Sequence, residues 1–136
     1  WRLRTNDKLT SGTTWHAAGL MVTFGSLSAT STEWRKYTKS LYSDILPSST
    51  STSTGFKPCG FIELATDHDR LEEYRRVSTF NRYQGVEVEE IGPEVVKDRF
   101  PLIDCSGVLA GFTVPTDGRV NPYDATMSLA SAARGM

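Results

Sequence analysis

Residues 61–80 read FIELATDHDRLEEYRRVSTF, and the hydrophobic period changes in the middle of this stretch. Phe61 to Leu64 is typical of a strand core, because β-favouring apolar residues gather in a short run. Asp67 favours the start of a helix, since its carboxylate can accept from the free backbone N–H groups there. The apolar positions of that helix form one stripe at helical spacing: Leu71, Tyr74, Val77 and Phe80. A strand followed directly by an amphipathic helix indicates a mixed α and β fold.

The segments on either side continue this mixture. Residues 86–91 alternate with period two, as in a half-buried strand, and 108–114 form another apolar strand-like run. Strands with one polar face favour an antiparallel or mixed sheet over a parallel sheet that is covered on both faces. Further helices are expected at residues 15–20, 31–46, 93–100 and 123–136, and a further strand end at residues 1–4.

The expected helix that starts at Ser31 carries an apolar stripe, which should pack against the rest of the fold. The stripe consists of Trp34, Tyr37, Leu41 and Ile45. Pro47 should end this helix, because proline lacks the N–H and clashes with the preceding turn. The Ser/Thr run at residues 48–54 offers no apolar side chain to bury, so we expect a solvated loop.

Composition places the chain among ordinary globular domains. It has 136 residues, of which 38% are hydrophobic and 23% charged, so we expect one folded unit. The formal net charge of −1 gives no electrostatic footprint for nucleic acid or an anionic membrane. We therefore expect neither partner. Cys59 and Cys105 lack any partner motif and are expected to be small, buried, unpaired residues of a reducing compartment.

The two ends of the sequence do not resemble natural termini. The chain begins with Trp1 rather than methionine, and it stops at Met136 while a helical pattern is still running. We therefore expect an internal piece of a longer protein.

One short stretch, SGTTWHAAGL at residues 11–20, places His16 beside a tryptophan within small residues. A hydrolytic triad is not indicated, because the chain has no G-x-S-x-G turn for a nucleophile. A metal site is not indicated either, since no cluster of ligands accompanies His16. The other histidine, His68, lies between two aspartates and is expected at the surface. A core or capping role for His16 stays open at this point.

The neighbours of His16 favour a ligand over a structural role. Gly12 allows a close backbone approach, and the hydroxyls around it lie where a helix start could stabilise a phosphate. The side chains of Ala17 to Gly19 are small and project little from the surface, so a broad ring system could lie against it. The pattern indicates a cofactor cradle in which the imidazole faces the ring.

The segment KLTSGTTWHAAGL at residues 8–20 closely resembles the flavin-attachment motif of the sarcosine and dimethylglycine dehydrogenase family. These are FAD-dependent amine oxidoreductases with a D-amino-acid-oxidase-like fold. The resemblance continues in order through residues 54–56, 60–62, 69–74, 100–102 and 114–122. The TWHAAG motif is specific, whereas each later piece means little by itself.

The resemblance implies an α/β (α+β) fold class. It implies a fragment of an FAD-binding Rossmann-like domain, joined to the start of a substrate domain with a mixed or antiparallel sheet. Residues 1–30 would belong to the FAD-binding domain, residues 31–115 to the substrate domain, and residues 116–136 would return toward the FAD-binding domain.

The resemblance also implies that His16 carries FAD covalently, through the 8α carbon of the isoalloxazine. Such a bond raises the redox potential of the flavin and prevents its loss. The other residues expected to bind the cofactor are Gly12, Thr13, Thr14, Trp15, Ala17, Ala18, Gly19 and Leu20. No catalytic residue and no metal ligand is assigned within the chain, and the chain alone is expected to be inactive.

The activity implied is hydride removal from the N-methyl group of sarcosine or dimethylglycine. The iminium product would yield formaldehyde, or a methylene group passed to tetrahydrofolate, and electrons would leave through electron-transfer flavoprotein. The location implied is the mitochondrial matrix in a eukaryote and the cytoplasm otherwise. Most residues that contact the substrate should lie beyond Met136.

Three features depart from the family pattern. The G-x-G-x-x-G phosphate fingerprint is absent from the chain. Residues 4–6 lack the acid expected to hold the adenosine ribose. Pro47 and the Ser/Thr run stand where relatives usually continue an acidic helix.

Two other functions remain to be weighed. The first is a non-catalytic relative similar to the pyruvate dehydrogenase phosphatase regulatory subunit, which lacks the TWHAAG histidine. The second is an interaction fragment that binds no flavin.

Overall fold

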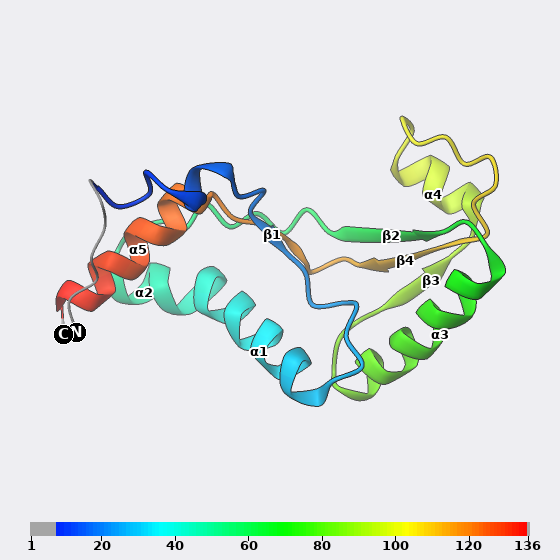
Figure 1. The fold of residues 1–136 in the computed structure, drawn as a ribbon, viewed down its shortest axis with the longest axis horizontal. Helices are drawn as coiled ribbons and strands as arrows, with labels where there is room; N and C mark the ends of the chain where they lie inside the picture. Colours follow the sequence, from blue (N-terminus) through cyan, green and yellow to red (C-terminus); the bar gives the residue numbers. More distant parts are fainter. Residues whose placement is uncertain (1–7, 136) are drawn as a thin grey trace.

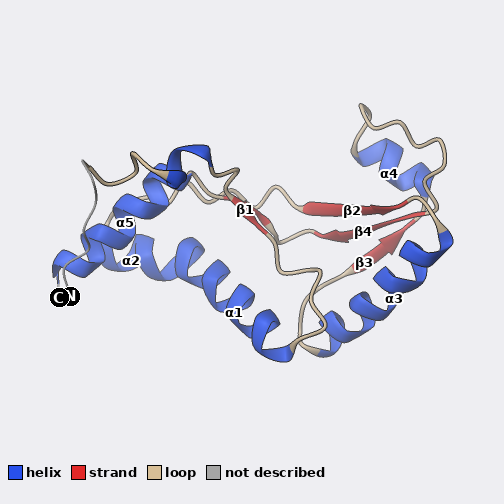
Figure 2. Cartoon of the chain, in the orientation of Figure 1, coloured by secondary structure: helices blue, strands red, loops and turns tan. Residues whose placement is uncertain are grey.

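A computed structural model of the chain describes residues 8–135 (Figure 1). The expected strand end at residues 1–4 and the missing ribose acid at 4–6 lie outside the described residues. In chain order the elements are η1 (Thr13–His16, a 3-10 helix), β1 (Leu20–Met21), α1 (Ala29–Ser40), η2 (Leu41–Ile45, a π-helical turn), α2 (Leu46–Thr50), β2 (Phe61–Ala65), α3 (His68–Tyr83), β3 (Glu89–Ile91), α4 (Pro93–Arg99), β4 (Ala110–Val114), β5 (Gly118–Arg119) and α5 (Pro122–Gly135). Helices and strands interleave as expected (Figure 2), so the mixed α and β class is confirmed.

The larger sheet has three strands in the order β2-β4-β3, and both neighbouring pairs are antiparallel. This confirms the expected sheet type. Every residue of the central strand β4 is buried. Two strands are shorter than expected: β3 begins at Glu89 rather than Val86, and β4 begins at Ala110 rather than Val108. Val86 is nevertheless buried in the core. The alternating pattern thus predicted the burial of this side chain correctly, although it did not predict where the strand begins.

Helices α3 and α4 lie on opposite sides of this sheet (Figure 2). On the α3 side, the Phe112 ring stacks on Phe24 at 6.1 Å between centroids and meets Tyr74 edge-on at 5.6 Å. Asp67 caps α3 as expected, because its Oδ1 accepts from the Arg70 N–H at 2.7 Å. On the other side α4 approaches closely, since a Cβ added at Gly111 would lie 2.8 Å from Val96 Cγ2.

A second, two-stranded sheet joins the two ends of the described chain. Strand β1 pairs antiparallel with β5, and Leu20 lies opposite Arg119. Met21, Val120 and Ala125 form a small buried cluster beneath it. As a result η1, α2 and α5 gather at one end of the molecule, away from the three-stranded sheet (Figure 1).

The long helical segment after Ser28 continues past Pro47, so the expectation that Pro47 ends it is wrong. The Leu46 N–H donates to the Leu41 carbonyl, five residues back, and this defines the π-helical turn η2. A widened turn just before Pro47 accommodates the missing N–H and the bulky ring of this proline. The segment ends instead at Ser51, which has a left-handed conformation with φ 54°.

The apolar stripe on α1 does not pack as expected. Trp34 and Tyr37 are 72% and 61% exposed. The opposite, polar face of the helix turns inward and is held by hydrogen bonds: Lys36 Nζ donates to the Gln84 carbonyl at 2.9 Å, and Lys39 Nζ donates to Asp117 Oδ1 at 3.3 Å. The spacing of apolar residues alone does not show which face of the helix packs inward, because here the polar side chains of the inner face hydrogen-bond to distant parts of the fold.

The Ser/Thr run and the cysteines also differ from expectation. Residues 48–50 belong to α2 rather than to a loop. Thr54 is buried and donates to the Tyr42 carbonyl, while the hydroxyls of Thr52 and Ser128 are 2.9 Å apart. The run is therefore tied to the fold by its hydroxyls rather than by apolar side chains. The cysteines are unpaired, as expected, but Cys59 is exposed and Cys105 is only partly buried.

Within residues 8–135, no helix combines the length and the apolar character needed to cross a membrane.

Candidate functional site

The stretch SGTTWHAAGL forms a short 3-10 helix followed by extended chain, and not the helix expected at residues 15–20. Helix η1 covers Thr13–His16, and Ala17 has the extended angles φ −74° and ψ 136°. Gly19 adopts a left-handed φ of 73°, which turns the chain into β1. The helix start that the sequence favoured for a phosphate is therefore the start of a four-residue 3-10 helix, whose dipole is small. The assignment of these residues to the cofactor stays a prediction.

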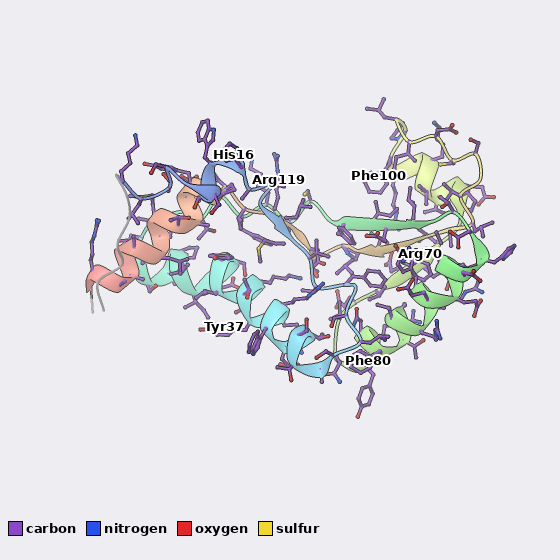
Figure 3. All side chains as sticks on the ribbon, viewed as in Figure 1. His16, Tyr37, Arg70, Phe80, Phe100 and Arg119 are labelled. Carbon is purple, nitrogen blue, oxygen red and sulfur yellow. The ribbon has the colours of Figure 1, made fainter. Side chains whose placement is uncertain are left out.

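His16 lies on the surface of the described chain (Figure 3). Its ring makes no hydrogen bond and no ion pair with any other described residue. Within residues 8–135, His16 therefore has none of the contacts that a core or capping role would require. Trp15 and Leu20, on either side of it, are 78% and 67% exposed although both are large and apolar. Exposed apolar side chains that flank a free imidazole fit a large flat ring system, which would cover them and meet the ring nitrogen.

Small residues fix this stretch to the rest of the fold. The Val120 N–H donates to the Gly19 carbonyl at 2.8 Å. A Cβ added at Gly19 would lie 2.2 Å from the Val120 carbonyl oxygen, so only glycine allows this approach. Beyond β1, the buried carboxylate of Asp117 accepts from the Thr23 N–H at 2.7 Å and from the Thr23 hydroxyl at 2.8 Å. Hydrogen bonds at Gly19 and at Thr23 therefore hold β1, the strand that follows His16, on both sides.

Two pockets border the His16 segment. The first, of about 760 Å³, lies between the η1 region and α5 and is lined by Lys8, Leu9, Thr10, Ser11, Trp15, Tyr123, Met127 and Arg134. Half of this lining is polar or basic, and the other half, Leu9, Trp15, Tyr123 and Met127, suits the apolar part of a cofactor. The second, of about 440 Å³, is lined by Ala18, Gly55, Lys57, Arg119, Val120, Asn121, Pro122 and Asp124.

Lys57 and Arg119 both line the second pocket, which the sequence did not indicate. They lie opposite each other in an isolated antiparallel bridge, and each backbone N–H donates to the other residue's carbonyl, at 2.8 and 3.1 Å. Their separation by 62 positions hides the pairing from the sequence. Gly118 makes this pairing possible, because a Cβ there would lie 1.9 Å from the Lys57 carbonyl oxygen.

Comparison with known proteins supports a flavin site. The family model of FAD-dependent oxidoreductases matches residues 3–136. The human mitochondrial dimethylglycine dehydrogenase is 36% identical over 128 residues, which are 94% of this chain and 14% of that protein. The human mitochondrial sarcosine dehydrogenase is 33% identical over 127 residues, covering 93% of this chain and 14% of that protein. The chain thus spans about a seventh of the length of these relatives.

A solved structure shows the same fold. The crystal structure of L-proline dehydrogenase from P. horikoshii superposes with a TM-score of 0.81 at 26% identity, covering 92% of this chain and 32% of that one. The mouse mitochondrial pyruvate dehydrogenase phosphatase regulatory subunit is also similar, at 31% identity over 126 residues, which is lower than for the dehydrogenases. The non-catalytic alternative is therefore not favoured. From Leu3 to Met136, this chain belongs to the family of FAD-dependent oxidoreductases.

Proposed function

We propose that this chain is the flavin-attachment segment of an enzyme that oxidatively demethylates a small N-methylated glycine, such as dimethylglycine or sarcosine. The observation that carries the proposal is the exposed His16, with a free imidazole between exposed Trp15 and Leu20, in a family that uses FAD. The two curated dehydrogenases similar to this chain act, by their names, on these two amines. The resemblance of the TWHAAG motif supports a covalent bond from His16 to FAD.

In this proposal FAD, when bound, supplies the oxidising group that accepts a hydride from the N-methyl carbon. The chain's own residues position that group. Gly19 and the β1–β5 pairing fix the height of His16 above the sheet, and Trp15 and Leu20 cover apolar ring surface and exclude water. A rigid segment suits this task, because orientation of the reacting atoms supplies much of the rate gained by an enzyme.

The proposal extends to the partners and the location. Electrons would pass to electron-transfer flavoprotein, and the one-carbon product would leave as formaldehyde or be transferred to tetrahydrofolate. The two dehydrogenases are named as mitochondrial proteins, which supports a mitochondrial location.

The proposal is tested on the enzyme purified with its flavin. We expect a yellow colour that stays with the protein after acid precipitation, and formaldehyde release from dimethylglycine or sarcosine with an artificial electron acceptor. A protein that binds no flavin, as an interaction fragment would, gives a colourless pellet and no formaldehyde. Either result contradicts the proposal.

A variant pair isolates the role of His16. His16→Ala should release its flavin on acid precipitation while keeping part of it under native conditions, because other contacts still hold the cofactor. His68→Ala is the matched control, since His68 is the second histidine and is exposed at the start of α3. It should keep the acid-stable colour. Loss of the acid-stable colour in both variants would mean that the effect is not specific to His16.

A further inference from the structure

Strand β1, which follows the His16 segment, is too short to fix its own register. It consists of Leu20 and Met21, paired with two residues of β5. A slip of one residue in a strand pair turns every side chain to the other face and moves the strand by about 3.3 Å. The register of β1 therefore depends on contacts outside this short ladder.

Two contacts flank the ladder, one at each end. At the end nearer His16, the Val120 N–H donates to the Gly19 carbonyl at 2.8 Å. At the other end, the Asp117 carboxylate accepts from the Thr23 N–H at 2.7 Å and from the Thr23 hydroxyl at 2.8 Å. Both contacts are consistent with the register in which Leu20 lies opposite Arg119.

The Asp117 contacts are the ones that distinguish this register from its neighbours. They require a backbone N–H and a hydroxyl from the same residue, and Thr23 is flanked by Val22 and Phe24, which have no hydroxyl. A slip of one residue in either direction would leave the buried carboxylate without its hydroxyl donor. The backbone alone does not discriminate in this way, because every residue other than proline offers the same N–H and carbonyl.

The carboxylate that makes these contacts is fully buried, and Thr23 is buried with it. Lys39 on α1 donates to Asp117 Oδ1 at 3.3 Å and to Thr116 Oγ1 at 2.6 Å. Helix α1, strand β1 and the turn before β5 therefore meet at one charge. A buried ion pair is weak evidence for stability, because apolar residues often replace it without loss, and its best-attested use is to fix a register.

We propose that Asp117 is a positioning residue for flavin attachment, because through Thr23 it fixes the register of β1 and hence the position of His16. The imidazole lies four positions before Leu20, on the chain that leads into β1. A slip would displace it by about 3.3 Å, whereas reacting atoms must approach to about 3–3.5 Å. This inference rests on the proposed function, to which the bond between His16 and FAD belongs.

The attachment joins a ring nitrogen of His16 to the 8α methyl carbon of the flavin. The imidazole N–H bond and one methyl C–H bond break, and the two hydrogens stay with two electrons on the flavin, which is thereby reduced. A two-electron acceptor such as dioxygen, which becomes hydrogen peroxide, then reoxidises it. Asp117 exchanges no proton or electron in this reaction, so its contribution is to geometry.

The test follows the appearance of acid-stable flavin after FAD is added to the full-length apoenzyme. Asp117→Asn should slow this attachment about 10- to 100-fold, because a misplacement of about 1 Å can cost a factor of this order. The total flavin bound before acid is added should be unchanged. Thr23→Ser keeps the hydroxyl and should attach FAD at the parent rate, whereas Thr23→Val should be slower than the parent.

The matched control is Val96→Ala, which separates positioning from a general loss of stability. Val96 is fully buried on α4 and packs against the larger sheet, away from β1. The cavity left by the substitution should lower the thermal midpoint of unfolding, but the attachment rate should stay at the parent value. Equal slowing in Val96→Ala and Asp117→Asn would overturn the inference, and so would a parent rate in Asp117→Asn.

Amide hydrogen exchange over residues 17–23 reports on β1 without any flavin. Exchange should be faster in Asp117→Asn than in the parent and unchanged in Val96→Ala. Equal exchange in Asp117→Asn and the parent would overturn the inference. If the parent enzyme itself forms no acid-stable flavin, the proposed function has failed, and the exchange measurement alone then decides whether Asp117 fixes β1.

Discussion

Replacement of Asp117 by alanine should be among the most destabilising single changes in this chain. The Asp117 carboxylate is fully buried and accepts from the Thr23 N–H at 2.7 Å and the Thr23 hydroxyl at 2.8 Å. Lys39 adds a charge partner at 3.3 Å. In the alanine variant the buried N–H and hydroxyl of Thr23 lose their acceptor, while Lys39 is 23% exposed and can regain water. Breaking a buried charged network of this kind costs about 3–5 kcal/mol.

The matched control is Glu73→Ala on α3. Its ion pair with Arg70 is shorter, at 2.7 Å, but the two side chains are 50% and 47% exposed. Exposed pairs contribute only about 0.2–1 kcal/mol, because water screens them in both states. Burial rather than distance should therefore decide the order of the two variants.

The assay is equilibrium unfolding in urea, followed by far-ultraviolet circular dichroism at 25 °C. With a slope of about 1.5 kcal/mol per M, the loss in Asp117→Ala should lower the midpoint by roughly 2–3 M, and Glu73→Ala by less than about 0.7 M. Asp117→Asn should fall between them, because the amide keeps one acceptor oxygen but loses the charge. The reasoning is refuted if Glu73→Ala costs as much as Asp117→Ala, or if Asp117→Ala costs under about 1 kcal/mol.

Three further outcomes are expected. Burial, and then the hydrogen bond to Glu63, raise the pKa of Tyr74 to about 12, so absorbance at 295 nm should show one tyrosine that ionises later than the rest, and Glu63→Gln should bring it down. Because the pKa of Tyr74 is higher in the folded state, the neutral Tyr74 side chain contributes its full share of stability below the unfolded pKa of about 10, and this share disappears as the pH rises through about 12. A Tyr74 that ionises together with the other tyrosines would contradict this. Gly118→Ala should cost about 1–3 kcal/mol in the urea assay, since its Cβ would lie 1.9 Å from the Lys57 carbonyl oxygen, whereas Gly135→Ala, with open space around it, should not destabilise. Cys59 is exposed and Cys105 is only partly exposed, so a thiol reagent should modify Cys59 first. Faster modification of Cys105 would contradict this order.

The central part of the fold could be predicted because its signals are local. The Asp67 cap, the stripe of α3 and the strand-like runs each depend on neighbours in sequence. The structure confirms the cap and the burial of Leu71 and Val77, and it confirms the strands over part of their expected length. The helix through Pro47 could not be predicted, since the π-helical turn that admits the proline leaves no mark in the residue pattern. The inverted packing of α1 could not be predicted either, because it depends on where Lys36 and Lys39 find distant acceptors.

The candidate site, too, could be predicted from the sequence only in part. The segment around His16 was visible because residue type and spacing coincide over a few positions. Its true conformation was not, because β1 forms only through pairing with β5, about a hundred residues later in the chain. The position of Lys57 and Arg119 beside Ala18 could not be predicted for the same reason, because it depends on the bridge between these two distant residues.

Mass spectrometry of one peptide can show whether His16 is the attachment point of FAD. The holoenzyme is digested, and the peptide that spans Leu9 to Met21 is isolated and fragmented. We expect this peptide to carry the added mass of the flavin, with fragmentation placing the mass on His16, and we expect the His16→Ala peptide to carry none. An unmodified Leu9–Met21 peptide from an enzyme that is yellow and active would contradict the claim.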